Sequence, residues 1–178
     1  MIRTRVGYAG GSQDNPTYYN LGDHTETVQF DFDPDRISYQ ELLAVFWDSH
    51  DAAMPPLPVQ YKSIIFYHDE EQKRLALESK AQLEAKQGKA IFTEILPYSR
   101  FYLAEDYHQK HYLRNVPDLN KELTAIYPNI NDFINSTAVA RVNGYLGGNG
   151  DAETLRQGID SYGLSPVAQQ RLLAMVAR

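Results

Sequence analysis

The sequence predicts an α+β fold in which a mixed β-sheet and a layer of helices form a two-layer sandwich. Strand and helix patterns interleave along the chain, and some predicted strands follow one another directly, which favours a mixed sheet over an all-parallel doubly wound one. The chain of 178 residues is long enough for one domain, and its 43% hydrophobic and 22% charged residues are the proportions of a globular protein.

Five segments are predicted to be strands or extended segments. Residues 2–8 and 26–33 alternate between polar and apolar side chains, which is typical of half-buried strands. A short apolar run within 61–68 suits a buried strand, and 92–96 and 101–103 are predicted to be extended. The proline-rich stretch 54–58 can form neither a helix nor a central strand, so we expect a loop there.

Helices are predicted from the signals at their ends. Ser38 and Glu41 have the spacing of a capping box before an amphipathic helix that ends near His50. Asp69 is the expected N-cap of a helix that stops at about Gly88. Further helices are expected over 105–114, 118–126, 151–162 and from Pro166 onward.

Composition and charge exclude several classes of function. Lys and Arg number 17 and Asp and Glu number 23, so the net charge is −6 at pH 7, and no basic run indicates a nucleic-acid binder. No apolar window has the length that crosses a bilayer, and the first residues do not resemble a secretory signal, so we expect no membrane partner and a cytoplasmic location. Cysteine is absent, which removes disulfides, zinc–thiolate sites and any thiolate nucleophile from this sequence.

Two other patterns have simpler interpretations than a functional site. Glu105, His108 and His111 have the spacing of a helical carboxylate–histidine metal site, but such sites need matching motifs on other helices, and the sequence contains none. Surface or structural histidines are therefore favoured, and we expect no metal and no bound cofactor. The glycines of 144–150 lack the full spacing of a dinucleotide or phosphate loop and predict a turn.

The remaining candidate site is a carboxylate among hydroxyl groups. Tyr18 and Glu26 lie on either side of one short loop, and Tyr61 follows the proline-rich stretch at the start of another predicted strand. A carboxyl group near apolar neighbours can stay protonated at neutral pH and act as an acid, and tyrosine hydroxyls can donate hydrogen bonds to an oxygen beside it. A surface glutamate with two packed tyrosines is the alternative interpretation of the same residues.

Ordered motifs along the chain resemble those of the A-type peptide-methionine sulfoxide reductases. The motifs are 6–11 (VGYAGG), 15–18 (NPTY), 22–26 (GDHTE), 45–51 (VFWDSHD), 60–66 (QYKSIIF) and 101–109 (FYLAEDYHQ). The resemblance covers about residues 2–115. The segment 140–148 (ARVNGYLGG) is similar to an extension found in a branch of the family that lacks C-terminal resolving cysteines.

The resemblance implies a ferredoxin-like two-layer fold with the helices on one face of the sheet. It also implies reduction of the S epimer of methionine sulfoxide to methionine, in proteins or as the free amino acid. In this family a cysteine thiolate attacks the sulfoxide sulfur and becomes a sulfenic acid. Glu26 then corresponds to the acid that protonates the departing oxygen, and Tyr18 and Tyr61 correspond to the hydroxyls that hold it. The family binds no cofactor and takes its electrons from an external thiol, such as a thioredoxin-like protein.

The sequence departs from the family at the nucleophile. The family's cysteine lies in a Gly-Cys-Phe-Trp-Gly segment before the strand that matches 2–8, so we expect the first strand and helix of the family fold to be missing. The expected domains are a truncated reductase core over 1–115 and a helical C-terminal extension over 116–178 packed on it. The chain as written is predicted not to turn over, because loss of a covalent nucleophile typically costs on the order of a million-fold in rate.

Three explanations of the missing segment remain open. The first is a complete reductase whose start was misassigned at Met1. The second is a cysteine-free module that binds oxidised methionine without repairing it, and the third is a non-functional remnant. The DNA upstream of Met1 separates the first explanation from the others, because an in-frame Gly-Cys-Phe-Trp would reveal the segment.

Overall fold

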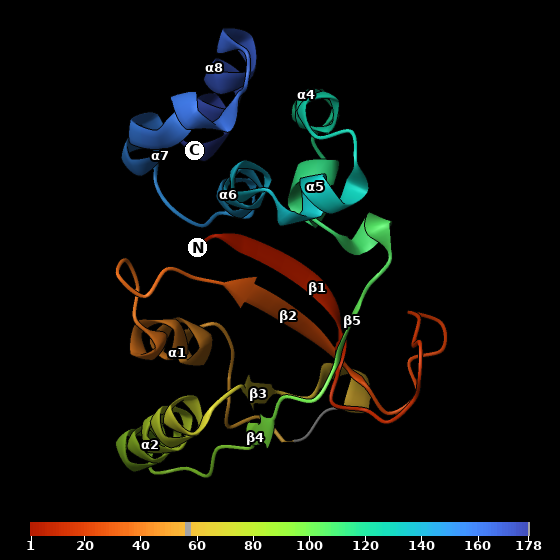
Figure 1. Cartoon of the computed structure of the whole chain (residues 1–178). Helices are drawn as coiled ribbons and strands as arrows, with labels where there is room; N and C mark the ends of the chain where they lie inside the picture. The colour runs from red at the N-terminus through yellow and green to blue at the C-terminus, as the bar shows by residue number, and fades with distance from the viewer. Residues whose placement is uncertain (56–57, 178) are drawn as a thin grey trace. The chain divides into compact units, whose positions relative to one another are not determined.

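The computed structural model describes residues 1–55 and 58–177, and its helices and strands confirm the predicted α+β class (Figure 1). Residues 56–57 of the expected proline-rich loop lie outside the described residues. The strands of the described residues are β1 (Arg3–Ala9), β2 (Thr25–Asp31), β3 (Ile64–Tyr67), β4 (Glu94–Pro97) and β5 (Phe101–Leu103).

In the described residues the strands form two sheets, whereas the sequence predicts a single mixed sheet. The first sheet has the order β2-β1-β5, and β1 pairs with β5 antiparallel, with Tyr8 opposite Tyr102. In the second sheet β3 and β4 pair parallel, with Ile65 opposite Ile95. A parallel pair needs a crossover connection, and α2 (Glu70–Gln87) provides it between β3 and β4.

The chain divides into two compact units. Unit 1 contains Met1–Val6, Val28–Asp31 and the residues from Glu105 to the end of the chain. Unit 2 contains Gly7–Thr27 and Phe32–Ala104. Each unit has its own buried apolar cluster.

In unit 2 the ends of α1 (Tyr39–Asp48) and α2 lie where the sequence predicts. The Ser38 Oγ accepts a hydrogen bond from the Glu41 N–H at 3.2 Å, and the Glu41 carboxylate accepts one from the Ser38 N–H at 2.7 Å, which completes the capping box. The Asp69 carboxylate accepts a first-turn backbone N–H of α2 at 2.7 Å. The helix ends at Gly88, whose left-handed φ of 63° costs little in a residue without a Cβ.

Unit 2 has a small core between its two helices and the β3–β4 pair. α1 contacts α2, and α2 contacts both strands (Figure 1). Leu43, Ile65 and Ala76 form the buried centre of this core. Trp47, the single tryptophan of the sequence, packs against the centre, and its Nε1 donates a hydrogen bond to the Ser79 Oγ at 3.0 Å.

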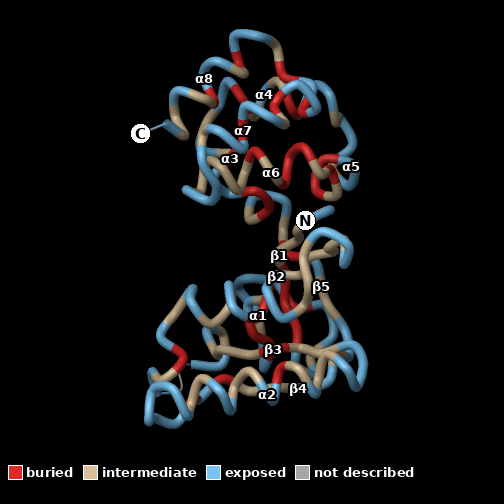
Figure 2. Tube along the Cα trace, turned by 90° about the vertical axis from the view of Figure 1, so that its left-hand side faces the viewer, coloured by how far each residue is buried: buried red, intermediate tan, exposed pale blue. Residues whose placement is uncertain are grey.

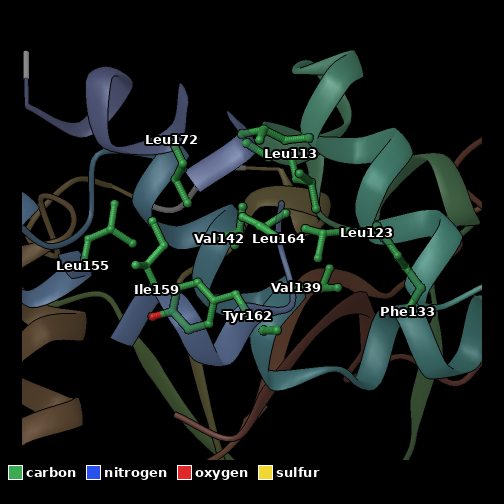
Figure 3. Packing of buried hydrophobic residues seen from close by; sticks show 13 residues of the cluster. Leu113, Leu123, Phe133, Val139, Val142, Leu155, Ile159, Tyr162, Leu164 and Leu172 are labelled. Carbon is green, nitrogen blue, oxygen red and sulfur yellow. The ribbon is translucent and has the colours of Figure 1, made fainter. Parts of the chain in front are cut away.

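Unit 1 is mainly helical and has the larger apolar core. Its helices are α3 (His111–Arg114), α4 (Pro117–Ile126), α5 (Ile130–Asn135), α6 (Thr137–Leu146), α7 (Ala152–Gly158) and α8 (Pro166–Val176). The 3-10 turn η2 (Asp106–His108) precedes α3, and η3 (Ile159–Tyr162) lies between α7 and α8. Side chains from these elements, among them Leu113, Leu123, Val142, Leu155 and Leu172, point toward one another (Figure 3). Buried residues concentrate along α6 (Figure 2). Burying one such side chain contributes about 1.5–3 kcal/mol, so this cluster is the main source of stability in unit 1.

Two local predictions for unit 1 are wrong. The segment 105–114 is not one helix, because Lys110 takes a left-handed conformation with a φ of 55° and separates η2 from α3. The glycine-rich turn begins later than expected, since Gly144 lies inside α6 and the helix continues to Leu146. The last helix begins as predicted, with Ser165 as its N-cap and proline in its first turn.

Candidate active site

Glu26 is the second residue of β2, and hydrogen bonds tie the start of this strand to a short 3-10 turn, η1 (Val59–Tyr61). The Gln60 Nε2 donates to the Glu26 Oε1 at 2.7 Å, and the Thr25 Oγ1 donates to the Val59 backbone oxygen at 2.7 Å. Each bond joins residues 34 positions apart in the chain. Successive strand residues point to opposite faces, so the buried Thr25 leaves Glu26 on the exposed face. Glu26 is thus exposed and has an amide partner, and the apolar neighbours that the sequence predicts for it stay a prediction.

Tyr61 ends η1, and hydrogen bonds hold the segment that follows it. The Ser63 Oγ lies 2.8 Å from both the His50 Nε2 and the Thr93 Oγ1. The residue Tyr61 itself is 52% exposed. Tyr61 therefore lies at the surface of unit 2, where a molecule from solvent can contact it.

Tyr18 lies at the tip of the loop between β1 and β2. Thr17 and Asn20 exchange two backbone hydrogen bonds, at 3.2 and 3.0 Å, so Tyr18 and Tyr19 are the central residues of a tight turn. The two rings contact edge to face with their centroids 5.4 Å apart, and Tyr18 is 39% exposed. A loop, and neither a strand nor a helix, thus presents this hydroxyl.

The three predicted residues all lie in unit 2. Gln60 connects Glu26 to the turn that ends in Tyr61, and its amide hydrogen bond brings these two elements together. Tyr18 lies on a different segment of the same unit, the loop between β1 and β2. The grouping of all three hydroxyl and carboxyl groups around one ligand oxygen stays a prediction.

Sequence reasoning missed two residues that shape this region. It did not identify Gln60 as the partner of Glu26, and it did not identify Asp23 as a strongly perturbed acid. Asp23 accepts hydrogen bonds from the backbone N–H of Ser12 at 2.8 Å and from its hydroxyl at 2.9 Å, and these bonds lower the pKa of Asp23 to about 2. The only signal for either residue was that its family motif also contains a candidate residue, Glu26 for Asp23 and Tyr61 for Gln60.

The described residues contain no group of three or more histidine, aspartate or glutamate side chains placed to hold a metal ion. Glu105 and His108 lie 3.9 Å apart, measured from Oε2 to Nε2. Among residues 1–55 and 58–177, no helix combines the length and the apolar character needed to cross a membrane.

Curated proteins are similar to this chain over most of its length. A sequence model of the family described as "Peptide methionine sulfoxide reductase" matches residues 1–142. The peptide methionine sulfoxide reductase of Drosophila melanogaster is 42% identical over 172 residues, which cover 96% of this chain and 69% of the relative. The peptide methionine sulfoxide reductase A5 of Oryza sativa is 43% identical over 151 residues, which cover 82% of this chain and 59% of the relative. The chain thus spans only part of the length of the relatives it matches.

Two solved structures are similar in both sequence and fold. The reduced form of Mxr1 from Saccharomyces cerevisiae matches with a TM-score of 0.60 and 28% identity, covering 64% of this chain and 71% of that chain. Methionine sulfoxide reductase A of Corynebacterium diphtheriae matches with a TM-score of 0.56 and 30% identity, covering 64% of this chain and 63% of that chain. The family match reaches into α6, past the end of the motif resemblance near residue 115. The chain belongs to the peptide methionine sulfoxide reductase family.

Proposed function

We propose that this chain binds methionine sulfoxide, in peptides and proteins or as the free amino acid, through the residues with which its family reduces this group to methionine. Its family membership supports this function. The observation that carries the proposal within the structure is the 2.7 Å hydrogen bond from Gln60 to Glu26, which anchors the candidate acid to the turn that ends in the candidate donor Tyr61.

In the proposed reaction Glu26 donates a proton to the sulfoxide oxygen. Tyr18 and Tyr61 donate hydrogen bonds to the same oxygen, which polarises the S=O bond and favours attack on the sulfur. The exposed position of Glu26 allows the carboxyl group to exchange protons with solvent between reactions. Specificity for the S epimer would then follow from the fixed side from which these three groups hold the oxygen.

The electrons for the reduction must come from a thiol. A thiolate attacks the sulfoxide sulfur, the protonated oxygen passes to the thiol as a sulfenic acid, and the methionine sulfide leaves. A second thiol then attacks the sulfenic acid, forming a disulfide and releasing water. This sequence contains no cysteine, so we propose that the chain as given binds the sulfoxide without turning it over. For the reaction that does include a nucleophilic thiolate, we propose cytoplasmic thioredoxin-like proteins as the natural donors of the second thiol, because the cytoplasm keeps thiols reduced.

Titration calorimetry tests the binding step. The probe is a blocked pentapeptide with a central methionine S-sulfoxide, and the same peptide with reduced methionine is the reference. We expect the sulfoxide peptide to bind more tightly, and Tyr61→Phe to weaken it about two- to tenfold through loss of one hydrogen bond. Tyr112→Phe is the matched control, because Tyr112 is 51% exposed and lies in unit 1. Equal affinities of the unmodified chain for the two peptides would refute the proposed function.

A turnover assay tests the need for a thiolate in the protein. The chain is incubated with the sulfoxide peptide and dithiothreitol, and methionine formation is followed by chromatography. We expect no methionine above the buffer rate, because hydrogen bonds that polarise the sulfoxide do not place a thiolate next to its sulfur. Turnover clearly above buffer would show that the chain needs no cysteine of its own.

A further inference from the structure

His24 is buried at the end of the loop that carries Tyr18, with 1% of its surface exposed. The backbone N–H of Gly11 donates to its Nδ1 at 3.1 Å, and its Nε2 lies 2.8 Å from the backbone oxygen of Gln13. A backbone N–H can only donate and a carbonyl oxygen can only accept, so Nδ1 must accept and Nε2 must carry the hydrogen. The other neutral tautomer would place donor against donor and acceptor against acceptor.

Further hydrogen bonds extend this arrangement to the turn at Tyr18. The Asp23 carboxylate accepts the backbone N–H groups of Ser12, at 2.8 Å, and of Gln13, at 3.2 Å. The Gln13 Nε2 donates to the backbone oxygen of Asn20 at 2.8 Å, and Asn20 closes the tight turn that presents Tyr18. A continuous chain of hydrogen bonds therefore runs from His24 through Gln13 to that turn.

The packing around His24 is close on both sides. A Cβ placed on Gly11 would lie 2.6 Å from the Asp23 Oδ1 and 2.7 Å from the His24 Cδ2, which is nearer than side-chain carbons approach. On the other side, the Tyr102 ring of β5 contacts the imidazole edge to face, with the centroids 5.4 Å apart. The Tyr102 hydroxyl donates to Asp14 at 2.9 Å, so β5 supports both the ring and the loop.

We infer that His24 is a positioning residue whose neutral Nε2–H tautomer holds the Tyr18 loop (residues 10–24) closed and thereby sets the place of the Tyr18 hydroxyl. The tautomer and the closure of the loop are independent of what the protein does. The consequence for ligand binding rests on the proposed function.

Nuclear magnetic resonance of the ring nitrogens tests the tautomer in the unmodified chain. In protein labelled with nitrogen-15, we expect the His24 ring at neutral pH to show a protonated Nε2 and an unprotonated Nδ1. A ring protonated at Nδ1, or one that exchanges freely between the two neutral forms, overturns the inference.

Amide hydrogen exchange tests the closure of the loop. His24→Phe keeps an aromatic ring beside Tyr102 but removes both polar ring atoms, so the amides of Gly11 and Asn20 should exchange about tenfold faster, as for the loss of about 1.4 kcal/mol. His24→Asn should partly restore the protection of Gly11, because the Asn Oδ1 can accept where Nδ1 did. His68→Phe is the matched control in unit 2, since His68 is exposed and stacks on Tyr98 outside the loop. Unchanged protection in folded His24→Phe overturns the inference, and if that variant does not fold, His24→Asn and the ring spectrum decide.

Binding of the sulfoxide pentapeptide tests the consequence for the site. His24→Phe should weaken binding about tenfold, and His68→Phe should leave it unchanged. Unchanged binding by folded His24→Phe shows that the loop does not position Tyr18 for the ligand and overturns that part of the inference. If the unmodified chain does not bind the peptide, the proposed function fails, while the ring spectrum and the exchange rates still decide whether His24 holds the loop.

Discussion

Lys110 is an amine that unit 1 buries, with 4% of its surface exposed. Its Nζ donates hydrogen bonds to the backbone oxygen and, at 2.9 Å, to the hydroxyl of Thr4. Burial disfavours the charged ammonium, and the nearby charge of Arg5 adds to this effect, so the pKa of Lys110 falls to about 8. Lys110, which interrupts the predicted helix, is therefore a residue whose charged form the fold disfavours.

This depressed pKa predicts that stability depends on pH in the alkaline range. The unfolded chain binds the Lys110 proton more tightly, with a pKa of about 10.4, so the free energy of unfolding rises as pH increases from about 8 to 10.4. The free energy of unfolding is measured with urea for the unmodified chain and for Lys110→Met at pH 7 and at pH 10.5. Relative to the variant, the unmodified chain should gain up to about 3 kcal/mol between these two pH values. A difference that is the same at both pH values would contradict the prediction.

Asp23 has a pKa lowered to about 2, because Ser12 donates two hydrogen bonds to its ionised form. The folded state favours the carboxylate, so its stabilising contribution is present above the unfolded pKa of about 3.9 and is lost as pH falls through 2. We expect the urea midpoint of the unmodified chain to exceed that of Asp23→Asn at pH 6 and the two midpoints to converge near pH 2. Midpoints that stay equally far apart down to pH 2 would show that the Asp23 charge does not support the fold.

At the scale of the element, hydrogen bonds within a few residues explain where the helices begin. Ser38, Asp69 and Ser165 each accept a backbone N–H of the first turn that follows. Such a cap satisfies a donor that has no partner inside its own helix. These signals lie in neighbouring residues, which is why the sequence predicts the starts of the corresponding helices.

Removing one cap should have a measurable cost. Ser38→Ala loses the side-chain half of the capping box of α1, so the free energy of unfolding should fall by about 1 kcal/mol. Gln40→Ala is the control, because Gln40 is an exposed residue of the same helix and its substitution should change stability by less than about 0.5 kcal/mol. Equal losses in the two variants, measured by urea unfolding, would rule out the cap as the cause.

The elements that the sequence did not predict depend on distant contacts. The left-handed Lys110 places its ammonium against Thr4, which lies 106 positions away in the chain, and no local pattern contains that information. Gly144 suggested a turn, but its helix packs into the core of unit 1 and continues through it. The tertiary contacts of Lys110, and those of the helix that contains Gly144, outweigh the local preferences of these two residues.

The candidate site shows the same limit. Motifs identify Tyr18, Glu26 and Tyr61, because the resemblance assigns a role to each position. They do not indicate the hydrogen bond from Gln60 to Glu26, which spans 34 positions, or the exposed face on which Glu26 lies. Register and burial are set by the pairing of whole strands, so the sequence predicts the residue types of the site better than their surroundings.

At the scale of the whole molecule, stability is divided between two apolar clusters of unequal size. The larger cluster, in unit 1, includes side chains from Leu113 to Leu172 (Figure 3). The expected boundary between a core over 1–115 and an extension over 116–178 stays a prediction. Because unit 1 has its own apolar core, we expect most of the stability of this unit to come from that core.

The helical core should be sensitive to loss of volume. Leu172→Ala on α8 removes a fully buried side chain and should lower the free energy of unfolding by about 2–5 kcal/mol. Val167→Ala on the same helix removes an exposed side chain and should cost less than about 0.5 kcal/mol. Thermal unfolding followed by circular dichroism distinguishes the two, and a small effect of Leu172→Ala would indicate that α8 contributes little.

The placement of Trp47 gives the molecule an internal optical label. Because the single indole lies in unit 2 and packs against the core of that unit, its emission reports on the melting of unit 2. Fluorescence and circular dichroism recorded on one sample can therefore distinguish concerted from stepwise melting. Coincident curves would mean that the two units share one cooperative transition, and separated curves would assign a melting temperature to each.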